Sequence, residues 1–207
     1  MNLDNLTPFR YENLLLPQLR EILAKFPMVI IPIGILEWHG NHNALGMDGL
    51  VAQHLCDRVM GEIKQGVLMP LHWVGTFGYV HYEGTICYEE QTTTQFLTQL
   101  LSQVVKVGFK LIVLISGHGG SWQQRAIQTA VKSTLELFGK SQKELAIIGV
   151  VYPELAPNIR IGHAGPEETS LLMRIGQIKG TLLVDLQNHQ NQTEILQIGR
   201  ASCRERV

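Results

Sequence analysis

The chain has 207 residues, of which 45% are hydrophobic, and its formal net charge is -1. A chain of this length and composition can bury one sizeable core, so we expect a single α/β domain. The small charge and the lack of a Lys- or Arg-rich run argue against nucleic acid or an anionic membrane as the main partner, and no apolar run approaches the roughly 20 residues of a membrane-spanning helix.

Segments with helical and strand periodicity alternate along the chain. We predict helices over residues 14–26, 49–63, 92–107 and 122–138, and a further helix that begins near Pro166. We predict strands over residues 28–35, 67–74, 111–115 and 146–151. The first of these strands is almost entirely apolar, which is typical of a parallel sheet covered on both faces. The alternation predicts a three-layer α/β/α sandwich with a mainly parallel central sheet.

The N-terminus and the cysteines narrow the class of protein further. The first residues lack the basic and apolar regions of a signal peptide, so we expect a cytoplasmic protein. Cys56, Cys87 and Cys203 are scattered and odd in number, which argues against a disulfide framework and against a cysteine-based zinc site. Any metal ion would therefore be held by His, Glu and Asp side chains.

Side chains that bind metals well follow the first predicted strand. Glu37 and His39 project to the same side of an extended segment, and Asp48, near the N-cap of the next helix, can turn back toward them. Two carboxylates and an imidazole suit Zn²⁺, Mn²⁺ or Fe²⁺ better than Ca²⁺. We interpret this stretch as one half of a metal site.

Further candidates follow later strands. His118 comes after the third predicted strand, and His163 and Glu168 come after the fourth. Parallel sheets bind their ligands at the carboxyl ends of the strands, so we expect these side chains to meet the first group there. Taken singly, a lone His or a helix-capping Asp is more often structural. The glycines beside His118 could make a tight turn or bind a phosphate, although the loop lacks the Lys of a P-loop.

Aromatic and other histidine residues carry weaker signals. Four aromatic side chains could line a pocket, but we interpret them as core residues: Trp73, Phe77, Tyr79 and Tyr82. Three histidines have no partner in the sequence that indicates a function: His54, His72 and His189.

Three motifs of the chain resemble those of the creatininase, or creatinine amidohydrolase, family. That family carries Glu-x-His-Gly-x-His followed by Asp, then Asn-Gly-His-Gly-Gly-Asn, then His-Ala-Gly-x-x-Glu-Thr-Ser. The matching stretches here are residues 37–42 with Asp48, residues 116–121 and residues 163–170. The segment 82–86 is also similar to the family's Phe-Pro-Gly-Thr-Ile loop.

The resemblance implies a metal-dependent amidohydrolase with two adjacent divalent ions, a three-layer α/β/α fold and a ring-like homohexamer. At the matching positions, Glu37, Asp48 and His118 would hold one ion. His39 and Asp48 would hold the second ion, with Asp48 as the bridge between them.

One departure from the family pattern concerns the fifth ligand. In creatininase a Glu two residues after the loop His completes the second ion site, and this chain has Gly120 there. We name Glu168 as the substitute ligand; the alternative is a carboxylate that supports the ligands or the N-terminus of its helix. The best proton carrier is His163, because the ordinary pKa of His lies near working pH.

Three functions remain open at this point. The first is hydrolysis of a C–N bond in a small amide or formamide through a metal-activated water. The second is a metal-binding or assembly role without catalysis, since several residues around the motifs differ from the family pattern. The third is binding of a phosphate ligand by the glycine loop.

Residues 198–207 differ in character from the chain before them. Their basic sequence resembles the translation of a short-read sequencing adapter. We therefore interpret residues 198–207 as a non-native tail and expect one domain over residues 1–197, truncated at its C-terminus. The alternative is an ordinary charged tail, which re-amplification of the source DNA across this junction would distinguish.

Overall fold

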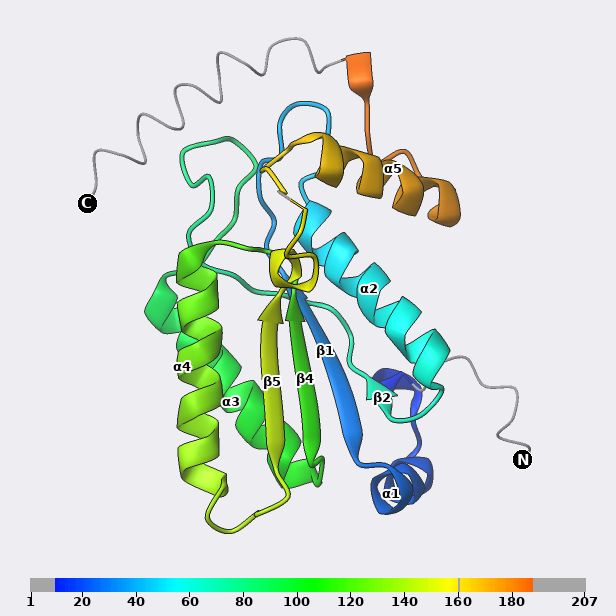
Figure 1. Cartoon of the computed structure of the whole chain (residues 1–207), viewed down its shortest axis with the longest axis vertical. Helices are drawn as coiled ribbons and strands as arrows, with labels where there is room; N and C mark the ends of the chain where they lie inside the picture. The colour runs from blue at the N-terminus through cyan, green and yellow to red at the C-terminus, as the bar shows by residue number, and fades with distance from the viewer. Residues whose placement is uncertain (1–9, 160, 188–207) are drawn as a thin grey trace.

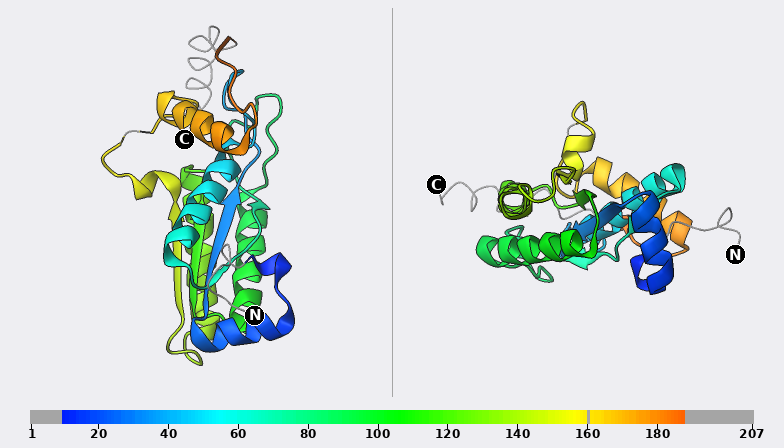
Figure 2. Two further views of the ribbon diagram at one scale, coloured as in Figure 1. Left: turned by 90° about the vertical axis from the view of Figure 1, so that its right-hand side faces the viewer. Right: turned by 90° about the horizontal axis from the view of Figure 1, so that it is seen from below.

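The computed structural model describes residues 10–159 and 161–187 and has a sheet with helices on both sides (Figures 1 and 2). The strands are β1 (Met28–Gly34), β2 (Val67–Leu68), β3 (His72–Trp73), β4 (Leu111–Ser116) and β5 (Ala146–Val151). The helices are α1 (Leu16–Lys25), α2 (Met47–Ile63), α3 (Glu90–Val107), α4 (Ser121–Phe138) and α5 (Pro166–Lys179), with the 3-10 helices η2 (Tyr11–Asn13) and η3 (Tyr152–Leu155).

The strands pair in the order β2–β1–β4–β5, β3 also pairs with β1, and each of these pairs is parallel. Side chains of β1 alternate between two layers. Val29, Ile31 and Ile33 join a cluster with α1, α3 and α4, whereas Met28 and Ile30 pack against α2. An all-apolar strand thus contributes to two cores, because successive side chains point to opposite faces. The predicted three-layer α/β/α sandwich is confirmed.

A smaller apolar cluster joins α5 to α2. Met47 and Val51 of α2 pack with Leu172 and Ile175 of α5 and with Tyr152 of η3. This packing holds the first turn of α5 near the carboxyl end of the sheet (Figure 1).

Most element boundaries lie within two residues of the predictions, and two differences concern the surroundings of the site. The strand expected over residues 67–74 is divided into β2 and β3, and Pro70 lies between them; proline has no N–H to donate to a neighbouring strand. Helix α2 begins at Met47 rather than residue 49, so Asp48 lies in its first turn and Gly46 is the N-cap. Both changes leave the order of the elements as predicted.

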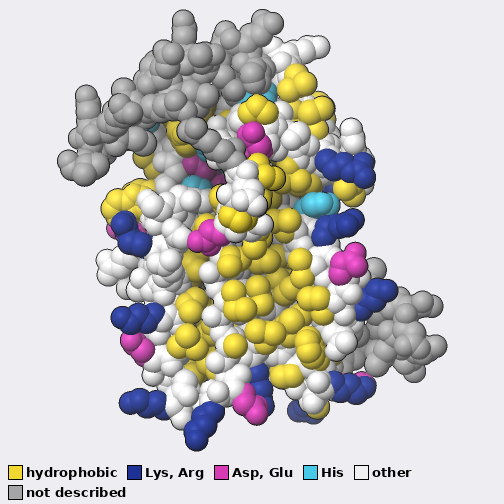
Figure 3. All heavy atoms as spheres, viewed as in Figure 1, with side chains coloured by type: hydrophobic (Ala, Val, Ile, Leu, Met, Phe, Trp, Pro, Cys, Tyr) yellow, Lys and Arg dark blue, Asp and Glu magenta, His cyan; other side chains and the backbone are white. Residues whose placement is uncertain are grey.

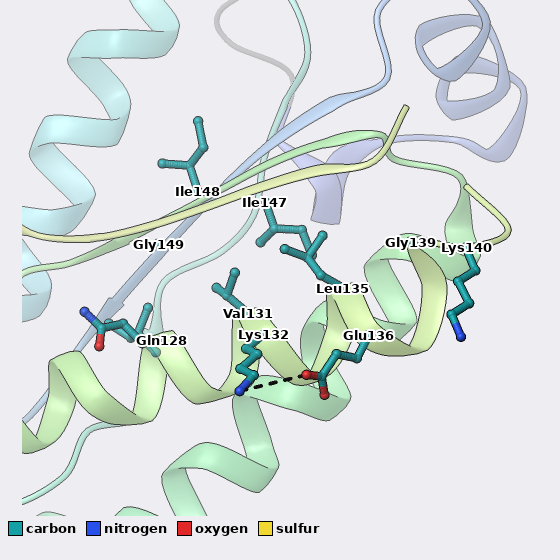
Figure 4. Close-up of a pocket in the computed structure, with 11 residues that line it drawn as sticks. Gln128, Val131, Lys132, Leu135, Glu136, Gly139, Lys140, Ile147, Ile148 and Gly149 are labelled. Atoms are coloured by element: carbon teal, nitrogen blue, oxygen red, sulfur yellow. Dashed lines mark ion pairs between the residues drawn. The ribbon is translucent and has the colours of Figure 1, made fainter. Parts of the chain in front are cut away.

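Apolar surface flanks β5 on both of its faces. Hydrophobic side chains gather over the sheet in the centre of Figure 3. Ile148 of β5, which points away from α4 in Figure 4, is 48% exposed. On the other face, Ile147 points toward Val131 and Leu135 of α4 in an open groove of about 890 Å³ (Figure 4). The residues that line this groove include none of the predicted site residues.

Two further predictions concern the C-terminal tail and membrane-spanning helices. The tail assigned to residues 198–207 lies outside the described residues, so the limits of the domain stay a prediction. Within residues 10–159 and 161–187, no helix combines the length and apolar character needed to cross a bilayer.

Candidate metal centre

The five predicted ligands lie together at the carboxyl end of the sheet. They come from the segment after β1, the first turn of α2, the loop after β4 and the first turn of α5, and all are buried: Glu37, His39, Asp48, His118 and Glu168. The structure therefore brings together residues separated by more than a hundred positions in the sequence. Their roles as ligands stay predictions.

Asp48 lies between the two histidines. Its Oδ1 is 3.2 Å from Nε2 of His39, and its Oδ2 is 3.2 Å from Nδ1 of His118. The same nitrogen of His118 is 3.1 Å from Oε2 of Glu37, and Nε2 of His39 is 3.9 Å from Oε2 of Glu168. The carboxylate of Asp48 thus faces two groups of donors, one on each of its oxygens.

Backbone carbonyl groups orient both imidazole rings. His39 Nδ1 lies 3.0 Å from the carbonyl oxygen of Glu37, and His118 Nε2 lies 3.1 Å from that of Thr76. When one nitrogen of a neutral ring donates to a carbonyl, the other nitrogen carries the lone pair. In both rings that other nitrogen faces Asp48, and metal-binding histidines are oriented in the same way.

The carboxylates and histidines shift one another's pKa values. Burial opposes the charge on His39, but the carboxylates of Asp48, Glu168 and Glu37 outweigh it and raise its pKa to about 9. Burial likewise opposes the charge on His118, and hydrogen bonds to Asp48 and Glu37 raise its pKa well above the ordinary value. Burial also favours neutral Asp48, yet both histidines hold its pKa below the usual range. Such a site favours positive charge at the two histidines, which a divalent cation could supply in place of protons.

Three buried atoms of this cluster support the fit to a cation. When the two histidines are neutral, their nitrogens that face the carboxylates carry no proton, and among the described residues Oε2 of Glu37, Nε2 of His39 and Oδ2 of Asp48 then have no hydrogen-bond partner. Buried polar atoms are normally paired, because an unpaired one loses its hydration without compensation. Donor atoms of Glu37, Asp48 and His118 also lie within 4.8 Å of one another. These nitrogen and oxygen donors fit a divalent cation of the Zn²⁺, Mn²⁺ or Fe²⁺ type.

Glycines allow the elements to approach the cluster. A Cβ on Gly117 would lie 1.8 Å from the carbonyl oxygen of Asp48, so only glycine fits where the loop after β4 meets α2. The N–H of Gly117 donates to the carbonyl of Ile33 at 3.1 Å. This loop is therefore packed against α2 and presents His118, and the amide of Gly117 is not available to a phosphate.

His163 lies beside the cluster on the loop before α5. Its ring centroid is 4.3 Å from that of His39, and its Nε2 is 2.7 Å from the carbonyl oxygen of Trp38. Donor atoms of Glu37, His39 and His163 lie within 4.8 Å of one another. Burial, followed by the charge on His39, lowers the pKa of His163 to about 4. A neutral imidazole is therefore present next to the candidate ligands.

Glu168 makes contacts that suit both roles considered from the sequence, a metal ligand and a supporting carboxylate. Its Oε2 faces His39, and the same oxygen accepts the N–H of Ala164 at 2.6 Å. Ala164 has a φ of 54°, a left-handed conformation that is unfavourable for a residue with a Cβ. Burial raises the pKa of Glu168 to about 7. This carboxylate therefore holds the loop that carries His163 and also reaches the candidate ligands.

The sequence prediction missed residues that support the site. The aromatic residues predicted to pack in the core do not do so: Phe77 and Trp73 are each 40% exposed, and Tyr79 stacks on His163 with ring centroids 3.9 Å apart. The side-chain oxygen of Gln123, a buried residue of α4, accepts the N–H of Thr76 at 3.0 Å. A Gln in an amphipathic helix carries no pattern that marks such a role.

The fold and the site together define a parallel α/β sandwich with a carboxylate–histidine cluster at the carboxyl edge of its sheet. The chain belongs to the creatininase family: the family's profile, described as creatinine amidohydrolase, matches residues 12–194. Expected membership of this family is thereby confirmed.

Named relatives of the chain are hydrolases. It is 26% identical over 166 residues to the creatinine amidohydrolase of Pseudomonas putida, and the matched region covers 72% of this chain and 64% of that protein. It is 25% identical over 130 residues to the 3-dehydro-scyllo-inosose hydrolase of Thermotoga maritima, and the matched region covers 62% of this chain and 40% of that protein. The chain thus spans less than two thirds of the length of either protein.

A solved structure of a mutant creatininase, of Zn-Zn type, has the same fold. Its TM-score with this chain is 0.74 at 22% sequence identity, over 87% of this chain and 76% of the other. At this level of identity the likeness supports the fold and leaves the chemistry to be argued from the residues.

Proposed function

We propose that this protein is a metal-dependent amidohydrolase that cleaves a C–N bond in a small amide or formamide with a water molecule activated by two divalent cations. The observation that carries the proposal is the position of Asp48, whose two carboxylate oxygens each lie 3.2 Å from a histidine nitrogen. One carboxylate that faces two groups of donors suits a bridging ligand.

The two ions would share Asp48. Glu37, Asp48 and His118 would hold the first ion, and His39, Asp48 and Glu168 would hold the second. Support for this division comes from the two separate sets of distances around Asp48. The fully buried donors lack thiolates, which favours Zn²⁺, Mn²⁺ or Fe²⁺.

A pair of divalent cations, when bound, lowers the pKa of a water molecule and polarises a carbonyl group. In hydrolysis of an amide, a C–O bond forms to the water oxygen, and the C–N bond breaks when the leaving nitrogen receives a proton. His163 is the proposed carrier of this proton. Its Nε2 faces the carbonyl of Trp38, so the lone pair on Nδ1 accepts the proton and later returns it to nitrogen. Burial and then the charge on His39 lower its pKa to about 4, below the ordinary value on which the sequence prediction rested, so the ring begins the cycle neutral and would pass a proton on readily.

The substrate class is a small amide. Candidates are creatinine, a formamide of a pyrimidine precursor to riboflavin or deazaflavin, and the end of a short peptide. Gly120 stands where creatininase has a carboxylate, which favours an amide other than creatinine. We also propose a homo-oligomeric assembly, a hexamer by family resemblance.

Elemental analysis combined with an amide screen tests the proposal. The purified protein should hold two divalent ions per chain, and removal of these ions by a chelator should abolish hydrolysis of the amide that it cleaves, with recovery when Zn²⁺ or Mn²⁺ is returned. Bound metal without turnover of any amide would favour the non-catalytic alternative. Failure to bind any divalent cation would refute both, and ligand binding that survives chelation would favour the phosphate alternative.

A further inference from the structure

The segment between β3 and α3 makes direct contact with the candidate ligands. The N–H of Tyr79 donates to Oε1 of Glu37 at 2.7 Å, which leaves Oε2 of Glu37 facing His118 at 3.1 Å. The backbone lies so close that a Cβ on Gly78 would be 1.8 Å from Oε1 of Glu37. The main chain at residues 78 and 79 therefore determines how the Glu37 carboxylate is presented.

The side chain of Tyr79 makes a second contact, with the proposed proton carrier. Its ring stacks on His163 with centroids 3.9 Å apart and an interplanar angle of 24°. His163 lies outside regular secondary structure, on a loop in which the next residue, Ala164, has a positive φ. The orientation of this imidazole therefore depends on its neighbours. They are the ring of Tyr79 at 3.9 Å, the rings of His39 at 4.3 Å and Trp38 at 6.1 Å, and the carbonyl of Trp38, 2.7 Å from Nε2.

Tyr82 has a different neighbour in the same loop. Its ring stacks on Trp38 with centroids 4.2 Å apart and an interplanar angle of 17°. Tyr79 and Tyr82 are both partly buried and belong to the same segment. They form a matched pair, in which only Tyr79 has a stacked contact with His163 in the described structure.

We propose that Tyr79 is a positioning residue. Its aromatic ring keeps the imidazole of His163 in its present plane and in the Nε2–H tautomer, both of which the proposed proton transfer needs. The kinetic part of this inference rests on the proposed function, whereas the geometric part does not. Stacking on one face restricts rotation of the imidazole and keeps Nε2 directed at the carbonyl of Trp38. The proposed contact is made by the face of the ring, so Phe should replace Tyr79 in this role.

The test compares Tyr79→Phe, Tyr79→Leu and Tyr79→Met with the control Tyr82→Leu, all loaded with Zn²⁺. Zinc content should be equal in all variants, because each retains the N–H that holds Glu37. Nitrogen NMR of the imidazoles, with His163 assigned from its loss in His163→Asn, should show the Nε2–H tautomer in the parent, in Tyr79→Phe and in Tyr82→Leu. A mixture of tautomers is expected in Tyr79→Leu and Tyr79→Met.

Kinetics on a hydrolysed amide provide the second measurement. Loss of a stacked pair should lower kcat about tenfold in Tyr79→Leu with little change in KM, and Tyr79→Phe should retain the parent rate. An unchanged tautomer in both aliphatic variants, or a defect in Tyr79→Phe as large as in Tyr79→Leu, would overturn the inference. Absence of any hydrolysis would count against the proposed function, while the NMR result would still decide the role of Tyr79.

Discussion

Replacement of Glu168 by Gln tests the fifth ligand most directly. The change keeps the shape of the side chain and an oxygen that can accept the N–H of Ala164, which now donates at 2.6 Å, so the fold should be retained. Only the negative charge is removed. We expect the Glu168→Gln protein to hold one divalent ion instead of two, because Glu37, Asp48 and His118 still form the first position.

The size of the effect follows from the distance between Glu168 and His39. Oε2 of Glu168 is 3.9 Å from Nε2 of His39. At this separation, a unit negative charge stabilises a unit positive charge by about 4 kcal/mol at an effective dielectric constant of about 20. A cation bound beside His39 would be stabilised by Glu168 to a similar extent, and a loss of this size weakens binding about a thousandfold. Burial raises the pKa of Glu168 to about 7. A substantial fraction of this carboxyl is therefore still ionised at neutral pH, and its deprotonation on metal binding offsets little of the roughly 4 kcal/mol.

The assay is competition for Zn²⁺ against a chromophoric chelator, followed by elemental analysis. Glu167→Gln is the matched control, since this glutamate lies next to Glu168 in the first turn of α5 and was not predicted to bind metal. It should bind two ions with the affinity of the parent protein. If Glu168→Gln also retains both ions with unchanged affinity, Glu168 only supports the loop before α5 and the second ion has another ligand.

Three further predictions concern the ligands and the proton carrier. Asp48→Asn should lose both ions, because the bridging charge is absent from both positions; elemental analysis that finds full occupancy would refute the bridge. His163→Ala should keep its metal but lose hydrolysis by about 10²- to 10⁴-fold, and an unchanged kcat would remove His163 from the mechanism. In the metal-free protein, the pKa of His39 is raised from 6.5 to about 9, so its charge stabilises the fold below pH 6.5 and this contribution is lost as pH rises through about 9. Urea unfolding in the presence of a chelator should show that decline, and a flat profile in the parent protein would contradict it.

The order of the elements and most of the candidate ligands were predictable from local patterns. Apolar runs of strand length, separated by helical periodicity, indicated a parallel sheet covered on both faces, and β1 is buried along its whole length. His39 and His118 could be named because the residues after parallel strands meet at one edge of the sheet. The division of the 67–74 segment was missed, although Pro70 is the local feature that explains it.

Contacts between distant segments were not predictable in this way. The stacking of Tyr79 on His163 and the hydrogen bond from the backbone N–H of Thr76 to the side-chain oxygen of Gln123 join residues far apart in sequence. The local sequence around an aromatic residue in a loop does not distinguish a residue that packs in the core from one that lies beside a functional site. The error on Tyr79 therefore reflects missing information about its neighbours.

The sequence alone determined which chemical groups are available and at which end of the sheet they lie, because strand periodicity and chain order are local properties. Only the tertiary structure decided the distances and orientations: which oxygen of Asp48 faces which histidine, and which backbone carbonyl selects each ring nitrogen. The physical reason is that a lone pair acts over a few ångströms and in one direction, and packing across many separate segments sets such a geometry.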